Sequence, residues 1–295
     1  TPTPLTSGHQ MESHITAGSV KYEYHMPSLY VVSTPIGNLE DITLRALRIL
    51  KEVSLIACED TRTTRKLLQR YEITTATTSY TEHNHKYKTP QIMKALASGD
   101  VALVSEAGTP AIHDPGLHLV TAALANGFDV VPIPGPSAVM AALAASGLPC
   151  DRFTFLGFLP GRQGQRRRLW ESVKDSPYTL VAFEAPHRLR ASLQGALSIL
   201  GDRRIVVGRE ITKLHEEWFR GSISEALSHF TEPRGEFTLV IEAATPVPTG
   251  TEAEALEMLR ALRAKGVRAQ QAVRQVSETL GLQRHSVYSL WLLLK

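Results

Sequence analysis

The stretch from Leu29 to Cys58 decides the fold of this chain. It begins with Leu29-Tyr-Val-Val-Ser-Thr34, an apolar and β-branched run that predicts a strand, and it ends with Val53-Ser-Leu-Ile-Ala-Cys58, which predicts a second strand. Between the two runs, leucines recur at helical spacing, so we expect a helix over residues 41–51. A strand, a helix and a strand in this order are typical of a parallel sheet covered by helices.

The same alternation continues along most of the chain. Residues 101–105 and 128–133 predict two more strands, each followed by a helix, over residues 115–125 and 137–145. After the turn Gly147-Leu-Pro-Cys150, a second series of apolar runs covers residues 153–159, 178–183, 204–207 and 237–242. We therefore expect two α/β lobes, with antiparallel or mixed pairing at the end of the second.

A helical tail is expected after the proline-spaced joint Thr245-Pro-Val-Pro-Thr-Gly250. Its helices are predicted over residues 252–265, 269–280 and 286–294, with a helix-turn-helix layout in the last two. The polar opening stretch predicts a disordered extension or a mis-called start upstream of Met26. The expected parts are an extension (1–27), an N-terminal lobe (28–147), a C-terminal lobe (148–245) and a small helical domain (246–295).

Composition excludes several classes of protein. The chain has 295 residues, of which 43% are hydrophobic and 21% charged, as in ordinary globular proteins. The formal net charge of +3 is too small to establish nucleic-acid binding. No apolar run reaches the roughly 20 residues of a membrane span, and the start lacks a signal-peptide pattern, so we expect a cytoplasmic protein.

No metal site is expected from the sequence. Cys58 and Cys150 are the only cysteines, they have no Cys-x-x-Cys spacing, and no histidine cluster has a metal-ligand interval. We expect both thiols to be reduced.

The loops after the predicted strands are the first candidates for a binding site, because ligands of open α/β sheets bind at the carboxyl ends of strands. Three of these loops, at residues 35–41, 106–110 and 134–137, place glycine beside proline. Glycine lets the backbone approach a ligand closely, although the same residues also make ordinary strand-to-helix turns. Neither a Gly-x-Gly-x-x-Gly fingerprint after the first strand nor a P-loop is present, which argues against a dehydrogenase or an ATPase.

Longer motifs carry a resemblance to one family. They are Thr34-Pro-Ile-Gly-Asn-Leu-Glu-Asp-Ile-Thr43, Ala57-Cys-Glu-Asp-Thr-Arg62, Ser105-Glu-Ala-Gly-Thr-Pro110 with Asp114-Pro-Gly116, Pro134-Gly-Pro-Ser137, Phe155-Leu-Gly-Phe-Leu-Pro160, Phe183-Glu-Ala-Pro-His-Arg-Leu189, Gly208-Arg-Glu-Ile-Thr-Lys213 and Arg234-Gly-Glu-Phe-Thr-Leu-Val240. In order and spacing the chain resembles the bacterial 16S ribosomal RNA cytidine 2′-O-ribose methyltransferases, of the tetrapyrrole-methylase fold superfamily. Glu106 stands where that family usually has aspartate, and Ala243 and Ala244 stand where a glycine is common.

The resemblance implies a methyltransferase that binds S-adenosylmethionine in the cleft between two α/β lobes, forms a homodimer and needs no metal. Its partner would be 16S ribosomal RNA within the small ribosomal subunit. By the same resemblance, the cofactor would be surrounded by Pro35, Gly37, Glu106, Gly108, Thr109, Ser137, Phe183 and Thr238.

The candidate catalytic residues are Glu59, Asp60, Glu184 and His187. Methyl transfer to a ribose hydroxyl requires removal of a proton, and a carboxylate or an imidazole can accept it. The alternatives are that Asp60 only caps a helix and that His187 is structural. The sequence leaves the identity of the base open.

Arginines are the candidate RNA contacts: Arg62, the run Arg162, Arg166, Arg167 and Arg168, and the tail residues Arg268, Arg274 and Arg284. Their guanidinium groups suit phosphate. A charge run is also typical of a solvated helix face, and the apolar residues 290–293 could make the tail a packing element instead.

Two other functions stay open. The shared fold superfamily allows a methyltransferase for a tetrapyrrole precursor, and the tail allows a helix-turn-helix regulator that senses a small molecule. The arginine run argues against the first, and the charged residues 59–62 at the pocket edge argue against the second.

Overall fold

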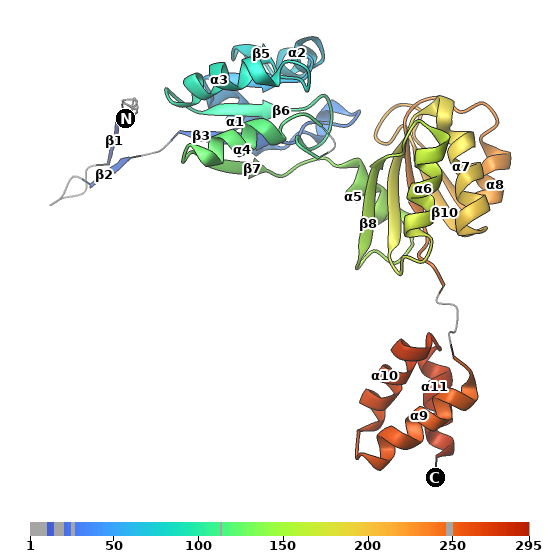
Figure 1. Cartoon of the computed structure of the whole chain (residues 1–295). Coiled ribbons are helices and arrows are strands. Elements are labelled where there is room, and N and C mark those ends of the chain that lie inside the picture. The colour runs from blue at the N-terminus through green and yellow to red at the C-terminus, as the bar shows by residue number, and fades with distance from the viewer. Residues whose placement is uncertain (1–10, 15–20, 25–26, 113, 246–249, 295) are drawn as a thin grey trace.

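A computed structural model of the chain describes residues 11–14, 21–24, 27–112, 114–245 and 250–294. Two α/β lobes follow each other along the chain, and a helical domain ends it (Figure 1), so the predicted fold class is confirmed. Most of the extension expected over residues 1–27 lies outside the described residues. In its described part, β1 (Met11–His14) pairs antiparallel with β2 (Lys21–Tyr24).

The first lobe contains a five-stranded sheet in which all neighbouring strands are parallel. Its strands are β3 (Ser28–Val32), β4 (Leu55–Cys58), β5 (Thr77–Ser79), β6 (Val101–Val104) and β7 (Asp129–Ile133), in the spatial order β5-β4-β6-β3-β7. Because the strands are parallel, their carboxyl ends lie along one edge of the sheet. The glycine- and proline-containing loops follow β3, β6 and β7 at that edge.

Helices cover both faces of this sheet. They are η1 (Leu39–Asp41), α1 (Leu44–Glu52), α2 (Thr61–Arg70), α3 (His85–Leu96) and α4 (Leu117–Ala125). Helices α1 and α2 bury leucines such as Leu50 and Leu67 on one face, whereas α3 and α4 bury Ile92, Leu96 and Leu119 on the other. Two separate cores on opposite faces hold the sheet rigid, and the loops at its edge are thereby fixed in position.

Helix α5 (Ala138–Ser146) packs on the second lobe, not on the first. Its residues Val139, Ala142 and Leu143 share a core with strands of the second sheet. The sequence predicts an N-terminal lobe over residues 28–147, and the packing of α5 on the second sheet corrects that boundary. Helical periodicity indicates that a helix has a buried face, but it does not indicate which sheet covers that face.

The second lobe contains a mixed five-stranded sheet, as expected. Its strands are β8 (Phe153–Phe158), β9 (Thr179–Glu184), β10 (Arg204–Arg209), β11 (Glu217–Ser222) and β12 (Phe237–Ile241), in the order β11-β10-β12-β9-β8. Only β8 and β9 pair in parallel; the other neighbours are antiparallel. Helices α6 (Gln163–Val173), α7 (Pro186–Leu200) and α8 (Ile223–His229) share a core with one face, and α5 covers the other.

The C-terminal domain consists of α9 (Glu252–Ala264), α10 (Ala269–Leu280) and α11 (Arg284–Leu293) around a core of its own. Thr251 and Glu254 form a capping box that starts α9. Gly281 takes the left-handed conformation, with φ of 61°, and ends α10. Among the described residues, no helix combines the length and the apolar character of a membrane span.

Candidate active site

A cavity of about 660 Å³ lies between the two lobes. The first lobe lines it with the loops that follow β3, β4, β6 and β7, and the second lobe lines it with β8, β9, the residues around Ile211, and β12. This volume is in the range of pockets that hold small organic ligands. A cavity therefore lies where the resemblance implies a cofactor site.

Backbone pairing shapes the floor of the cavity. Thr34 and Gly108 exchange two backbone hydrogen bonds of 2.9 and 3.0 Å, which join the loop after β3 to the loop after β6. Gly108 has a φ of 79°, a conformation that side-chain-bearing residues rarely adopt. The hydroxyls of Ser33 and Thr109 lie 3.0 Å apart across the same junction. Peptide groups and small hydroxyls are thus the polar groups at the floor.

An aromatic cluster forms the wall on the side of the second lobe. The ring of Phe183 lies 5.1 Å from that of Phe155 in an edge-to-face arrangement and 5.3 Å from that of Phe158. Phe158 is half-exposed, and all three rings line the cavity. A flat aromatic or apolar ligand group fits against such a wall.

Every ionisable side chain among the described lining residues is acidic. These side chains are Glu59, Glu106, Asp114, Glu184 and Glu236. Burial raises the pKa of Glu59, and the negative charges of Asp114 and Glu106 raise it further. Glu184 and Glu236 already pair with Arg188 and Lys213, at 2.9 and 3.0 Å. The acidic groups that favour a ligand with positive charge are therefore Glu59, Glu106 and Asp114, and Glu59 is a carboxylate with increased basicity.

Most of the predicted cofactor residues line this cavity. They are Glu106, Gly108, Thr109, Ser137, Phe183 and Thr238. Pro35 and Gly37 are not among the lining residues. A Cβ atom at Gly37 would collide with Cγ of Lys213 and lie 2.7 Å from Oγ1 of Thr212, so this glycine lets the two lobes approach each other closely. Asn38 reinforces that contact, because its backbone N–H donates to Oγ1 of Thr212 at 3.0 Å.

Asp60 caps a helix, which is the alternative to a catalytic role that the sequence leaves open. It is the N-cap of α2, and its carboxylate accepts a hydrogen bond of 2.7 Å from the backbone N–H of Arg62. The guanidinium of Arg62 lies 3.2 Å from the same carboxylate. Hydrogen bonds from Arg62 lower the pKa of Asp60. Asp60 does not line the cavity, and its arrangement fits a capping role better than that of a base.

Glu184 contributes to the cavity wall, but its side chain has no exposed surface. Its carboxylate accepts hydrogen bonds from the Ser192 hydroxyl and from the backbone N–H of Ala185, the latter at 2.8 Å. Nε of Arg188 lies 2.9 Å from Oε1 of Glu184 and forms an ion pair with it, but the N–H of Arg188 is not aligned for a hydrogen bond. Ala185 is the N-cap of α7, and Arg188 and Ser192 lie in its first and second turns, so the carboxylate positions that helix.

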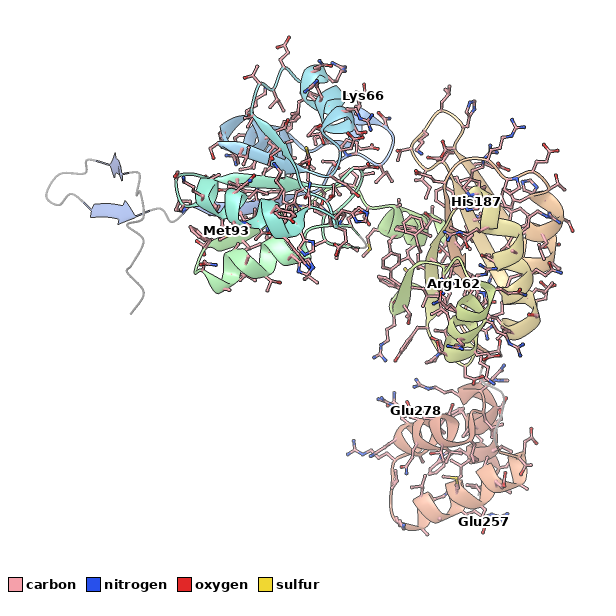
Figure 2. All side chains as sticks on the ribbon, turned by 45° about the horizontal axis from the view of Figure 1, so that its top comes forward. Lys66, Met93, Arg162, His187, Glu257 and Glu278 are labelled. Atoms are coloured by element: carbon pink, nitrogen blue, oxygen red, sulfur yellow. The ribbon has the colours of Figure 1, made fainter. Side chains whose placement is uncertain are left out.

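His187 and the predicted RNA-binding arginines differ in their surroundings. His187 is exposed on the first turn of α7 (Figure 2) and does not line the cavity.

The arginine run around the start of α6 has three exposed members, Arg162, Arg167 and Arg168. Arg166 is buried, and its Nη1 donates to the backbone oxygens of Pro160 and Gly161 at 2.9 and 3.3 Å. Its inclusion among the RNA contacts is therefore wrong, since its guanidinium holds a turn.

The other predicted arginines are exposed. Arg274 and Arg284 both lie beside Glu278, with separations of 2.9 and 3.3 Å. Arg268 is the exposed N-cap residue of α10. The three predicted arginines of the tail thus lie at α10 and α11, and α9 carries the further exposed arginines Arg260 and Arg263.

Sequence reasoning missed two kinds of lining residue. Asp114 and Glu236 were quoted inside motifs without a role, although acidic residues next to Gly-rich loops could have indicated the charge of the pocket. The cluster of Phe155 and Phe158 with Phe183 was also missed, because two strands and their pairing bring the rings together.

Comparisons with known proteins identify the family of the chain. The family described as "Tetrapyrrole (Corrin/Porphyrin) Methylases" matches residues 28–227. The chain belongs to this family. It is 47% identical over 271 residues to "Ribosomal RNA small subunit methyltransferase I" of Synechocystis sp., a match that covers 90% of this chain and 97% of that protein. The protein of the same name from Bacillus subtilis is 42% identical over 275 residues, covering 90% and 94%.

Within the tetrapyrrole methylases, the chain is thus a methyltransferase of the same group as these two proteins, and the predicted enzyme class is confirmed. Solved structures show the fold alone. Uroporphyrin-III-C-methyltransferase from Thermus thermophilus has a TM-score of 0.52 at 19% identity and covers 74% of this chain and 94% of its own. Diphthine synthase has a TM-score of 0.56 at 14% identity, covering 74% and 90%.

Proposed function

We propose that this methyltransferase transfers a methyl group from S-adenosylmethionine to the 2′-hydroxyl of a cytidine ribose in 16S ribosomal RNA. The names of the relatives support a ribosomal RNA substrate, and the motif resemblance supports the ribose of a cytidine. The observation that carries the proposal is the cavity between the lobes, whose described ionisable side chains are all acidic.

The residues of the cavity fit S-adenosylmethionine. The cofactor has a cationic sulfonium and an ammonium group, and Glu106 and Asp114 supply the complementary charge. The adenine fits against the phenylalanine wall around Phe183, and the peptide groups near Gly108 can hold the polar ends. When bound, this cofactor supplies an electrophilic methyl group; the protein contributes alignment and proton removal.

Glu59 is the proposed base. It lines the cavity at the carboxyl end of β4, whereas Asp60 caps α2, Glu184 is engaged with α7, and His187 lies outside the lining. The raised pKa of Glu59 brings its proton affinity closer to that needed near neutral pH. Its carboxylate would accept the proton of the ribose hydroxyl as the oxygen bonds to the methyl carbon, while the methyl–sulfur bond breaks and the neutral thioether S-adenosylhomocysteine leaves.

The substrate RNA would contact exposed arginines on both sides of the cleft. Arg62 at α2, Arg162, Arg167 and Arg168 at α6, and the tail cations are the candidates. Guanidinium groups on the surface position a phosphate backbone without specifying bases. We further propose a homodimer, as the resemblance implies, and a cytoplasmic location, as a ribosomal substrate implies.

One labelling experiment tests the proposal. The pure protein is given S-adenosylmethionine with a labelled methyl group and one acceptor: small ribosomal subunits, naked 16S RNA, or uroporphyrinogen III. We expect label in RNA. A 2′-O-methyl group blocks alkaline cleavage of the neighbouring linkage, so an alkaline ladder of the product should lack one band, next to a cytidine. Label in uroporphyrinogen would refute an RNA substrate, and an unbroken ladder of labelled RNA would refute ribose methylation.

A further inference from the structure

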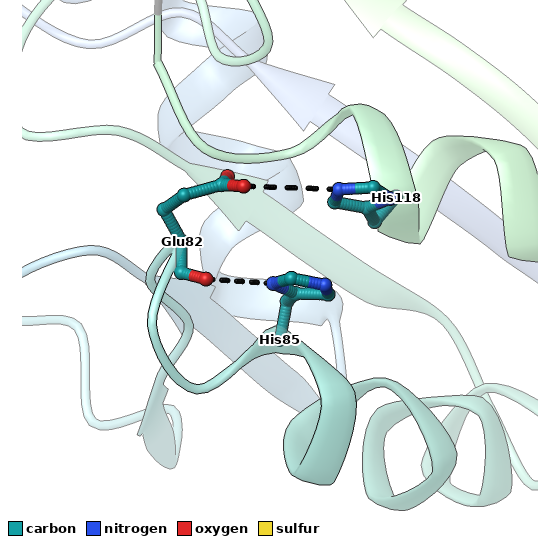
Figure 3. Close-up of side chains that lie close together, drawn as sticks. All are labelled: Glu82, His85 and His118. Atoms are coloured by element: carbon teal, nitrogen blue, oxygen red, sulfur yellow. Dashed lines mark hydrogen bonds and ion pairs between the residues drawn. The ribbon is translucent and has the colours of Figure 1, made fainter.

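A cluster of three metal-ligand types lies on the first lobe, outside the cavity between the lobes. Glu82 precedes α3, His85 is the first residue of that helix, and His118 lies in the first turn of α4 (Figure 3). One ligand atom from each of the three lies within 4.8 Å of the other two. Two imidazoles and a carboxylate are the donor set of three-ligand zinc sites in proteins.

His85 is the fixed member of the cluster. Its Nδ1 lies 2.7 Å from the backbone oxygen of Glu82 (Figure 3). A carbonyl oxygen only accepts hydrogen bonds, so Nδ1 carries the hydrogen of the ring and Nε2 keeps its lone pair. In metal-binding histidines the second ring nitrogen commonly donates in this way to a carbonyl, which orients the ring. The tautomer that metal binding requires is therefore already selected.

Glu82 and His118 can adapt to an ion. Their side chains are 67% and 55% exposed, and Oε1 of Glu82 lies 3.8 Å from Nε2 of His118. That separation is longer than a hydrogen bond but close to the spacing of about 3.4 Å between two ligands of a tetrahedral ion at metal–ligand distances near 2.1 Å. The two imidazoles now stack, with centroids 4.2 Å apart, so an exposed ring must turn for both lone pairs to meet one ion.

We propose that Glu82, His85 and His118 bind a divalent transition-metal ion of the zinc type, with water in the remaining position. The ion would link the start of α3 to the start of α4. Helix α4 begins just after Asp114, which lines the cavity, so the ion would also anchor one end of a cavity loop. The sequence did not indicate this site, because His118 is far from Glu82 and His85 along the chain and only the fold brings α4 beside α3.

The test measures binding of the metal alone to the full chain without an affinity tag, after dialysis against a chelator. Calorimetry with Zn²⁺ and absorption spectroscopy with Co²⁺ should give one ion per chain. His85→Ala and His118→Ala should each weaken binding by more than about tenfold, since the loss of a group that merely supports a ligand already costs about 10–100-fold. The matched control is His83→Ala, which removes an exposed imidazole beside the cluster and should leave the affinity unchanged.

Thermal unfolding gives a second, independent measurement. At a free Zn²⁺ concentration of about 100 times Kd, the Tm of the wild type should rise by about 5–10 °C, and the Tm of His118→Ala should not rise. The proposal is wrong if calorimetry with Zn²⁺ and spectroscopy with Co²⁺ detect no ion bound to the wild-type chain. It is equally wrong if His83→Ala weakens binding as much as His85→Ala and His118→Ala do.

Discussion

Replacing Glu184 by alanine tests whether its carboxylate has a structural or a catalytic role. The substitution removes the acceptor of two buried hydrogen bonds, from Ser192 and from the backbone of Ala185, and the counter-charge of Arg188. Ser192 is also fully buried, so its hydroxyl would be left without that acceptor and out of reach of water. We therefore expect a loss of folding stability that does not depend on any ligand.

The size of the loss follows from these contacts. Hydrogen bonds to a charged group contribute about 1.5–3 kcal/mol each, and removal of one member of a buried ion pair costs about 3–5 kcal/mol. We take about 3–5 kcal/mol for Glu184→Ala. At about 2–4 °C per kcal/mol, as for folded units of about 150–250 residues, the Tm should fall by about 6–20 °C.

Two variants calibrate this measurement. Ser192→Ala removes one of the hydrogen bonds and should lower the Tm by about 3–12 °C. Glu171→Ala breaks an exposed pair with Arg167, which is worth less than about 1 kcal/mol, so its Tm should change by less than about 4 °C. Calorimetry below the Tm of each variant should show S-adenosylmethionine binding to Glu184→Ala. A Glu184→Ala protein with the wild-type Tm, but with methylation reduced more than about 100-fold, would refute the reasoning and make this carboxylate catalytic.

Three further predictions concern the cavity and the tail. Glu59→Gln should lower kcat by about 10²–10⁴-fold with little change in cofactor affinity. The pKa of Glu59 is raised in the folded state, so its ionised form disfavours folding. At pH values above that pKa, Glu59→Gln should therefore have a higher Tm than the wild type, and this gain should vanish below the unfolded-state pKa of about 4.3. A Tm gain that persists at low pH would contradict this. Gly108→Val should abolish cofactor binding, because a β-branched residue is strained at φ of 79°. A backbone shift that relieves this strain would displace the two hydrogen bonds between residues 108 and 34. Gly127→Val, at the same φ of 79° but outside the cavity lining, should destabilise the fold and spare binding. The triple variant Arg268→Glu, Arg274→Glu and Arg284→Glu should keep the Tm within a few degrees, since the ion pairs of Arg274 and Arg284 are exposed. It should bind RNA more weakly, and the slope of log K against log salt concentration should become shallower by about 0.7–0.9 per lost phosphate contact. An unchanged affinity and slope would make the tail structural.

Local patterns predicted the elements whose apolar residues are strongly periodic. The alternation of strands and helices in both lobes and the bounds of α10 followed from the sequence in this way. Helix α2 did not, because its sequence starts with Thr-Arg-Thr-Thr-Arg-Lys and buries little beyond Leu67 and Leu68. The sequence could not predict which apolar residues at the end of the tail are buried. In the fold, Leu294 is buried in the helical domain, whereas Leu292 and Leu293 are exposed.

The site was predictable as a set of loops but not as a set of roles. Motif spacing predicted which loops meet, because the carboxyl ends of parallel strands share one edge. It could not distinguish Arg166 from its neighbours in the arginine run, since that distinction depends on which side of α6 faces the core. Nor could it distinguish Glu59 from Asp60, where a difference of one position separates a cavity residue from a helix cap.

By the resemblance, Glu106 stands where the family usually has aspartate, and this difference bears on the carboxylate of Glu59. Glu106 acts on Glu59 in two opposing ways: its negative charge raises the pKa of Glu59, and its backbone N–H donates a hydrogen bond that lowers it. The backbone contribution is the same for aspartate and glutamate, so the longer side chain changes only where the charge lies. A longer and more flexible chain lets that charge turn toward a cationic ligand and away from Glu59. We therefore expect the acidic character of the cavity to be kept and the basicity of Glu59 to depend on what occupies the cavity.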